Sequence, residues 1–581
     1  MKKYLLSIIC YLLPVTCYLL PVTFSSCSWI KEDPASLITP DKVENSEDGA
    51  RQWVTGIYSK WIYDMFCWGY FPKVLELDAD YISGPDWLFN KFGAGNFQGE
   101  SDVTDALWKG CYGLISRANL AEVEIKNMTN LTDEVRANAL GEVQFQRAFA
   151  YFLLVRAYGE IPIQSVTIGN NLSAIGNPRS AVKEVYNYII TDLENAVANL
   201  YPYGQAELGH VSAGSAAGLL AKVYATMAAA TMPAGTPVTV RTGPAYTMET
   251  GTKRYAPLET KVLFKKSVLG YENMPDSLYE KALFWAERLM DGSFGSYELL
   301  PYADLWKKVS ATASEFLFSV GSVNADAKYK TSVHTQYEGY YYSKGSDFLA
   351  SGGWVGCTRH WYDLFDHDDY RITKGVKHRW RYTFHEQSHS GFYYPETDEY
   401  AIMATGYDLG GNKHGEPTGI YADGVSYYYS HDSQCLAFTT KFEDVTDNTI
   451  ENADANYPML RLADVILIAA EAANELGEED KAVTYLNMVR KRSNAVLATK
   501  MDKDAMRSAI IEERAKELAC ESDRRWDLIR WGIYVDAMNA LGGKDDSGVN
   551  KNREERNVRF PLPISEINTN PNINSNNEGW N

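Results

Sequence analysis

The chain has 581 residues, and 56 Lys and Arg against 75 Asp and Glu give it a formal net charge of −19. A surface that acidic repels phosphate backbones, which argues against nucleic-acid binding. Hydrophobic residues make up 45% and charged residues 23%, ordinary values that exclude disorder as a description of the whole chain. Tyrosine is unusual, with 40 Tyr beside 43 Gly, so aromatic rings with a polar tip are in surplus.

Residues 1–26 have the pattern of a lipoprotein signal peptide. Two lysines precede an apolar stretch, 4–24, which two prolines interrupt and small residues follow. A transmembrane helix is the alternative, because about 20 apolar residues are long enough to span a bilayer. The prolines, the charged start and the small residues favour a signal peptide.

Phe24-Ser25-Ser26-Cys27 resembles a loose bacterial lipobox, in which the Cys becomes the lipidated first residue of the mature protein. Lys31-Glu32-Asp33 resembles the charged export tag of surface lipoproteins, and a solvated linker is its alternative reading. We therefore expect lipidation at Cys27 and a lipid-anchored acidic linker over residues 27–48.

Five cysteines follow Cys27, at positions 67, 111, 357, 435 and 520. They are far apart in the sequence and odd in number, and no CxxC or other metal-ligand spacing occurs. Neither a disulfide framework nor a zinc finger is supported, even though the export route is oxidising. We expect buried free thiols.

Helical periodicity begins after the linker. Apolar residues at 145, 148, 149 and 152 have the spacing i, i+3, i+4 and i+7, which predicts one buried helix face. Thr132-Asp133-Glu134 predicts the start of this helix, and Gly159 with Pro162 predicts its end. The same spacing recurs near residues 220–227, 278–289, 462–469 and 511–519.

These helices come in pairs joined by short turns, which suggests a solenoid of the tetratricopeptide kind, although no clean repeat of about 34 residues emerges. The predicted pairs are 101–127 with 132–158, 180–200 with 212–231, and 459–476 with 479–493.

We predict a single mostly α domain over residues 49–581. The helical scaffold is expected over 49–231, 276–319 and 457–540. Residues 232–275 alternate as strands and turns and predict a β-hairpin excursion. Residues 320–456 are rich in Gly, Tyr, Trp, His and Asp with little helical periodicity. Loops on a rigid scaffold usually carry binding, so this loop-rich insertion is expected to hold the ligand site.

Five motifs follow one another in the C-terminal part of the chain: YPMLRLADVILIAAEA (457–472), LNMVRKR (486–492), IEERAKEL (511–518), RWDLIRWG (525–532) and FPLPISEIN (560–568) with Asn570-Pro571-Asn572. In this order they resemble the SusD/RagB family of outer-membrane nutrient-binding lipoproteins. Weaker matches at 107–119, 147–152 and 352–371 extend the resemblance over nearly the whole mature chain.

The resemblance implies a SusD-like α-solenoid of tetratricopeptide-like helix pairs with loop-rich and short β-hairpin insertions. It also implies a lipid anchor in the outer membrane, exposure at the cell surface, and a SusC-like TonB-dependent transporter as partner. The implied ligand is an oligosaccharide or polysaccharide. A peptide, as in some branches of the family, is the alternative. The resemblance implies no enzyme activity and no cofactor.

A sugar ring presents an apolar C–H face and a rim of hydroxyls, so its site needs a flat aromatic ring with polar groups at the edge. Two segments, 68–92 and 340–354, supply aromatic rings together with polar groups. In the SusD/RagB family, which the chain resembles, ligand contacts tend to come from the corresponding parts of the chain. The candidate ligand residues are Trp68, Tyr81, Asp86, Trp87, Asn90, Tyr341, Tyr342 and Trp354, with Asp78 and Asp80 interleaved among them. The alternative for each ring is packing of a loop onto the scaffold.

His385-Glu386-Gln387-Ser388-His389 is an HExxH string, which on a helix would offer two imidazoles to zinc and Glu386 as general base. Its flanks read as strand and turn, and Pro395 stands where a third His would extend the motif. A zinc-dependent peptidase through His385, Glu386 and His389 is the alternative from another class. We predict a binding protein with no catalytic residue and no metal.

Charged residues in the family motifs have a structural reading. Arg461, Asp464 and Glu471 lie beside an apolar stripe, so we expect ion pairs at the helix margin. Residues 524–531 are expected to form salt bridges and cation–π contacts between helices. The acidic stretch 363–369 lacks the order of an EF-hand, and a solvated turn is expected there rather than a calcium site.

Overall fold

The computed structural model describes residues 43–66, 76–84, 93–97, 101–164, 176–241, 245–247, 253–255, 259–263, 274–324, 329–338, 340–344, 347–351, 353–381, 390–394, 426–429, 436–545 and 547–580. The expected signal peptide, Cys27 and the HExxH string lie outside these residues.

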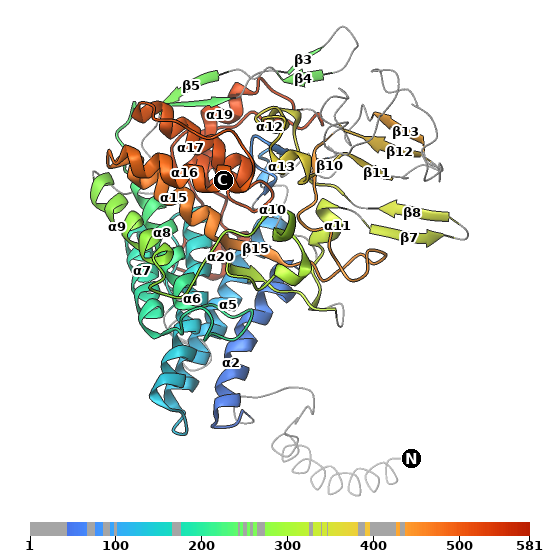
Figure 1. Ribbon diagram of the computed structural model, residues 1–581. Helices are drawn as coiled ribbons and strands as arrows, with labels where there is room; N and C mark the ends of the chain where they lie inside the picture. The colour runs from blue at the N-terminus through green and yellow to red at the C-terminus, as the bar shows by residue number, and fades with distance from the viewer. Residues whose placement is uncertain are drawn as a thin grey trace, which may run out of the picture.

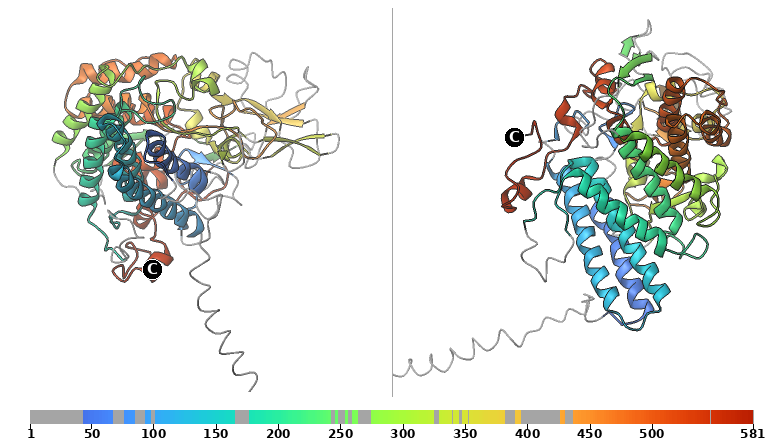
Figure 2. Two further views of the ribbon diagram at one scale, coloured as in Figure 1. Left: turned by 90° about the horizontal axis from the view of Figure 1, so that it is seen from below. Right: turned by 90° about the vertical axis from the view of Figure 1, so that its left-hand side faces the viewer.

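Paired α-helices form the body of the molecule (Figures 1 and 2), which confirms the predicted fold class. The pairs are α5 (Ser101–Asn127) with α6 (Asp133–Tyr158), α7 (Val182–Asn199) with α8 (Ala213–Ala230), and α15 (Leu462–Glu475) with α16 (Glu479–Arg492). The further helices are α2 (Glu47–Lys60), α9 (Pro275–Met290), α17 (Lys503–Glu517), α18 (Arg524–Arg530), α19 (Tyr534–Ala540) and α20 (Ile564–Thr569). Each helix from α5 to α9 packs against the next, and α15 packs against α9.

Local signals set both the start and the end of α6, at the positions that the sequence predicts. The Thr132 side chain accepts a hydrogen bond from the Val135 N–H at 3.2 Å and caps the first turn. At the other end Gly159 has a φ of 76°, and its N–H donates to the Val155 carbonyl at 3.0 Å. Glycine adopts this left-handed conformation without the strain that a Cβ would cause.

Burial of the central helices differs from the predicted single face. The second half of α6, all of α8 and all of α15 are buried on every side. The reason is that neighbours surround them, and α15 contacts α8, α9, α16 and α17. Asp464 and Glu471 therefore lie inside the protein, and the expectation of ion pairs at a helix margin is wrong about their position.

The last helix pair begins with a strand. β15 (Tyr457–Arg461) runs antiparallel to β6 (Phe316–Val320), and α15 starts only at Leu462. The predicted start at residue 459 is therefore wrong. Pairing with a distant strand outweighs local helix propensity here, and the Leu462 N–H donates to the Glu315 carbonyl at 2.8 Å.

The excursion 232–275 contains the predicted hairpin, β2 (Pro237–Arg241) with β5 (Glu259–Leu263), and a second pair, β3 (Ala245–Thr247) with β4 (Lys253–Tyr255). Short pieces precede or fill the insertion: η3 (Trp61–Phe66), β1 (Ile82–Ser83), α10 (Tyr302–Leu305), η7 (Lys308–Ser310), α11 (Val333–Tyr337), β7 (Tyr340–Lys344), β8 (Asp347–Ser351), β9 (Gly356–Cys357), α12 (Arg359–Tyr362), α13 (Tyr370–Thr373), β10 (Val376–Lys377), β11 (Arg379–Arg381), β12 (Ser390–Tyr393), β13 (Ser426–Tyr429) and β14 (Phe438–Thr439). A 3-10 turn, η9 (Glu555–Val558), follows α19.

Three cysteines in the described part of the chain, Cys111, Cys357 and Cys520, are buried free thiols. Their burial confirms that part of the prediction. Cys67 and Cys435 lie outside the described residues.

Candidate functional site

A short ladder joins the first aromatic segment, 68–92, to the residues that directly follow the second, 340–354. β1 (Ile82–Ser83) runs antiparallel to β9 (Gly356–Cys357). The Thr358 N–H donates to the Tyr81 carbonyl at 2.9 Å and extends the ladder by one bond. All of these residues are buried, and we call this ladder the floor of the candidate site; it links the first segment to the flank of the second.

A second set of backbone bonds holds Trp354 beside α11 (Val333–Tyr337), the helix that leads into the β7–β8 hairpin. The Trp354 N–H donates to the Gln336 carbonyl at 2.7 Å. One turn earlier, the Ser332 N–H donates to the Phe66 carbonyl at 3.3 Å, next to the segment that contains Trp68. The Trp354 side chain is half-buried. The flanks of both aromatic segments therefore meet twice.

Tyr341 and Tyr342 lie on β7, opposite Ala350 and Leu349 of β8. Figure 1 shows this hairpin projecting from the body on the same side as β11, β12 and β13. The other candidates, Trp68, Asp86, Trp87 and Asn90, lie outside the described residues.

Tyr81 is a packing residue, which corrects its assignment to the ligand site. Its side chain is only 3% exposed, and its hydroxyl donates to the Arg241 carbonyl at 2.8 Å. The Arg524 guanidinium lies 4.5 Å from the ring centroid. With one face covered by this cation and the rest packed in the core, no ring face is left for a sugar.

Asp78 and Asp80 are also structural. Neither is exposed to solvent. Arg524 forms two bonds with Asp80, at 2.7 and 2.8 Å, and Asp78 pairs with Arg553 at 2.7 Å and Arg525 at 3.0 Å. Burial alone would raise the pKa of Asp78, but Arg553 and Arg525 hold it below its ordinary value. These carboxylates fix the floor of the site and do not face a ligand.

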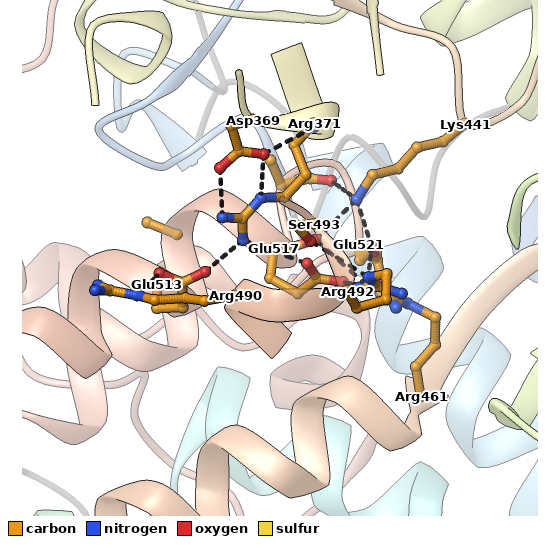
Figure 3. A network of polar contacts seen from close by, with 12 residues as sticks. Asp369, Arg371, Lys441, Arg461, Arg490, Arg492, Ser493, Glu513, Glu517 and Glu521 are labelled. Carbon is orange, nitrogen blue, oxygen red and sulfur yellow. Dashed lines mark hydrogen bonds and ion pairs between the residues drawn. The ribbon is translucent and has the colours of Figure 1, made fainter. Parts of the chain in front are cut away.

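A second buried network ties the insertion to the C-terminal helices (Figure 3). Arg461 lies at its centre and pairs with Glu315 at 2.7 Å, Glu517 at 2.9 Å and Glu521 at 2.6 Å. Arg371 of the insertion pairs with Asp369 at 2.7 Å and with Glu513 of α17 at 2.6 Å.

The charges of this network balance. The cations are Arg371, Lys441, Arg461, Arg490 and Arg492, and the anions are Glu315, Asp369, Glu513, Glu517 and Glu521. Burial alone would raise the pKa of Glu517, but the guanidinium groups of Arg492 and Arg461 hold it well below its ordinary value. A charge can remain buried only when it is paired in this way. We assign the network to structure rather than to ligand binding.

The sequence held a signal for this network. Glu513 and Glu517 are four residues apart, which places their carboxylates on one face of α17, and Glu521 follows four residues later, beyond the end of the helix. Arg371 belongs to a mid-chain motif, and only the fold brings that motif to the same face.

Residues 524–531 make the expected salt bridges and cation–π contacts. Arg525 lies 4.4 Å from the ring of Phe560 and 4.7 Å from that of Trp526. Arg530 pairs with Glu471 through two bonds, of 2.5 and 2.6 Å, and lies over Trp531 at 4.4 Å. The structural reading of this motif is confirmed.

The acidic stretch 363–369 is only partly solvated, so the expectation is wrong for Asp369. Asp369 is 1% exposed, caps α13 and pairs with Arg371, and Asp363 pairs with Arg359 at 2.6 Å. Within the described parts of the chain, no group of three or more His, Cys, Asp or Glu has a geometry that could hold a metal ion.

Among the clefts formed by the described residues, two of the larger ones have no residue of the β1–β9 ladder in their lining. One, of about 440 Å³, lies between the 203–212 loop and β6, and its half-buried rings are Tyr203, Tyr297 and Phe316. The other, of about 480 Å³, lies between β2 and α17. Neither is lined by a residue that the sequence selects as a ligand contact.

No helix in the described ranges has the length and apolar character needed to cross a membrane.

The family model described as "SusD family" matches residues 314–580, and the one described as "Starch-binding associating with outer membrane" matches residues 84–225. The chain is 26% identical to SusD-like protein P2 of Formosa agariphila over 602 residues, which cover 100% of both chains.

Solved structures of SusD-like proteins share the fold of this chain. The chain is similar to a SusD homolog from Bacteroides thetaiotaomicron with a TM-score of 0.70 and 21% identity, over 93% of this chain and 98% of that one. Surface glycan-binding protein A of Bacteroides thetaiotaomicron, in complex with laminarihexaose, has a TM-score of 0.62 and 17% identity, over 92% of this chain and 99% of that one. The two family models together cover more than two thirds of the chain, and the full-length relative agrees with them, so the chain belongs to the SusD/RagB family.

Proposed function

We propose that the protein binds a glycan at the cell surface and delivers it to a SusC-like TonB-dependent transporter. The observation that carries the proposal is the β1–β9 ladder with the contact of Trp354 to α11, because these join the flanks of the two aromatic segments in a member of this family. The proposed ligand contacts are Trp68, Asp86, Trp87, Asn90, Tyr341, Tyr342 and Trp354.

The net charge narrows the ligand class. A chain with a formal charge of −19 repels sulfated or uronic-acid glycans over distances of about a Debye length, which is roughly 8 Å at physiological ionic strength. A neutral glycan meets no such repulsion, and aromatic rings bind its C–H faces without a charged partner. We therefore expect a neutral oligosaccharide. Laminarihexaose, the ligand of one structural relative, is the first probe.

Calorimetric titration of the chain with laminarihexaose, a xylogluco-oligosaccharide, a polyuronate and a peptide library tests the proposal. We expect saturable binding of a neutral glycan, and its loss in Trp87→Ala. Phe284→Ala is the matched control, because Phe284 is an exposed ring, 49% accessible, on α9, on the side of the molecule opposite the β7–β8 hairpin. Saturable binding of peptides but of no glycan would replace the glycan by a peptide as ligand.

The anchor is tested separately. A diacylglycerol on Cys27 together with an N-terminal acyl chain supplies several chains, whereas a single chain holds only marginally. Cys27→Ala is therefore expected to leave the protein out of the outer-membrane fraction, which detergent partitioning and surface labelling of cells measure. A variant that partitions as the wild type does would overturn the lipoprotein assignment.

A further inference from the structure

Two cysteines that are far apart in the sequence lie side by side in the fold. The Sγ atoms of Cys357 and Cys520 are 3.9 Å apart, although 163 residues separate them. Both side chains are buried, 1% and 0% exposed. Among the residues that the structure describes, no other two cysteine sulfurs come within hydrogen-bond distance.

The Cys357 backbone is fixed on both sides. It lies on β9 opposite Ile82 of β1. On the other edge, its N–H donates to the Ala437 carbonyl at 2.9 Å, and its carbonyl accepts from the Ala437 N–H at 2.8 Å. The thiol therefore projects from a backbone with little freedom to move away.

The Cys520 backbone is held just as firmly, in a turn that only its surroundings can maintain. Cys520 and Ser522 have φ values of 62° and 69°, which side chains other than glycine rarely adopt. Lys441 Nζ donates to the Ala519 carbonyl at 2.7 Å, and the Ser522 N–H donates to the buried Glu76 carboxyl group. These contacts keep the Cys520 thiol facing Cys357.

We propose that Cys357 and Cys520 are a cross-linking site and form a disulfide when the protein folds in an oxidising compartment. One thiol, as thiolate, attacks the disulfide of an exchangeable oxidant, such as oxidised glutathione or an oxidised dithiol protein, and releases one thiol of that oxidant. The second thiolate attacks the resulting mixed disulfide and releases the other thiol. Two cysteine thiols are oxidised, one oxidant disulfide is reduced, and the two protons end on the released thiols.

The position of the bond gives it a consequence. It would connect β9, in the floor of the candidate ligand site, to the turn that follows α17 in the C-terminal scaffold. A covalent link across 163 residues removes much conformational freedom from the unfolded chain. Oxidation is therefore expected to stabilise the floor against thermal opening.

Mass spectrometry on the full chain tests the proposal. The chain is purified from the cell envelope without reductant, and in parallel the reduced chain is refolded in a mixture of oxidised and reduced glutathione. Trypsin places Cys357 in the peptide 345–359, Cys520 in 517–524 and Cys111 in 110–117. We expect a linked species of the first two peptides, two hydrogens lighter than their sum, whereas the buried Cys111 reacts with an alkylating reagent once the chain is unfolded in denaturant, before any reductant is added.

Two variants sharpen the test. Adding reductant is expected to lower the Tm of the wild type by roughly 2 to 4 °C, an effect that Cys111→Ser retains and Cys520→Ser loses. Free Cys357 and Cys520 after refolding in the glutathione mixture, or each carrying a separate glutathione, would overturn the proposal. The mass-spectrometric test uses the wild-type chain alone, so it does not depend on whether either variant folds.

Discussion

The helical scaffold and the loop-rich insertion 320–456 are held together by different means. Scaffold helices such as α8 and α15 are 18 and 14 residues long and are buried by neighbouring helices. The insertion contains helices of four or five residues and strands of two to five. Elements that short are not stable alone, so they depend on contacts with distant parts of the chain.

Those contacts are backbone ladders and buried ion pairs. β9 is held by β1, and Arg371 of the insertion is held by Glu513 of α17. The scaffold also contains buried ion pairs, such as Arg530 with Glu471, but its long helices are buried mainly by one another, whereas the short elements of the insertion depend on pairs and ladders that reach across to the scaffold. Substitutions and pH should therefore act on the two regions differently.

Removing the central cation is expected to have the largest effect. Arg461→Met leaves Glu315, Glu517 and Glu521 with one positive charge fewer in a fully buried network. Breaking a buried pair from one side costs about 3 to 5 kcal/mol, which urea unfolding measures. Lys481→Met is the control, because its pair with Glu287 is half-exposed, and such pairs contribute less than about 1 kcal/mol. Equal midpoints of urea unfolding for the two variants would show that the network contributes no more to the free energy of unfolding than a surface ion pair does.

Two tryptophans of the insertion should separate ligand binding from packing. If half-buried Trp354 stacks on a sugar, Trp354→Ala lowers affinity by about 1 to 3 kcal/mol and leaves the Tm nearly unchanged. Trp361 is 5% exposed and its Nε1–H donates to the Ala515 carbonyl at 2.9 Å, so Trp361→Ala should instead lower stability by about 3 to 5 kcal/mol. Calorimetry and thermal melts on both variants decide. A large fall in Tm with unchanged affinity for Trp354→Ala would leave Tyr341 and Tyr342 as the ring candidates of the insertion.

The contribution of Glu76 to stability should fall as the pH rises from about 5 to 8. Burial raises the pKa of Glu76 to about 8, so the folded protein keeps a proton that the unfolded chain, near its ordinary value of 4.5, has lost. Within this window, one such group changes the free energy of unfolding by about 1.4 kcal/mol per pH unit. Burial also raises the pKa of Glu338 to about 7 and that of Asp523 to about 6, with the same sign. Glu76→Gln should flatten the fall, and identical pH profiles of urea unfolding for variant and wild type would contradict this assignment.

The smallest effect is expected at a helix cap of the scaffold. Thr132→Ala removes the side-chain oxygen that accepts from the Val135 N–H at the start of α6, and losing such a cap costs about 1 kcal/mol. Thr132→Ser keeps the oxygen and should retain most of the stability. Urea unfolding of the pair measures the difference, and an equal loss in both variants would point to the methyl group rather than the hydrogen bond.

The sequence by itself determined the family and most helices of the scaffold, because these depend on signals within a few residues of one another. The cap at Thr132, the left-handed Gly159 and the stripe at 145–152 define α6 locally. The choice of the two aromatic segments also depended on local signals, because their composition is visible in the sequence. Composition does not distinguish a ring that stacks on a ligand from a ring that packs in the core.

Only the tertiary structure decided what each polar or aromatic residue does. Tyr81 is covered by Arg524, more than 400 residues away in the chain, and Asp80 pairs with the same arginine. The strand at 457–461 and the thiol pair of Cys357 and Cys520 likewise depend on partners more than 100 residues distant. Such contacts follow from the packing of the whole chain, because a charge, a strand edge or a thiol acquires its partner only when remote segments are brought together and shielded from water.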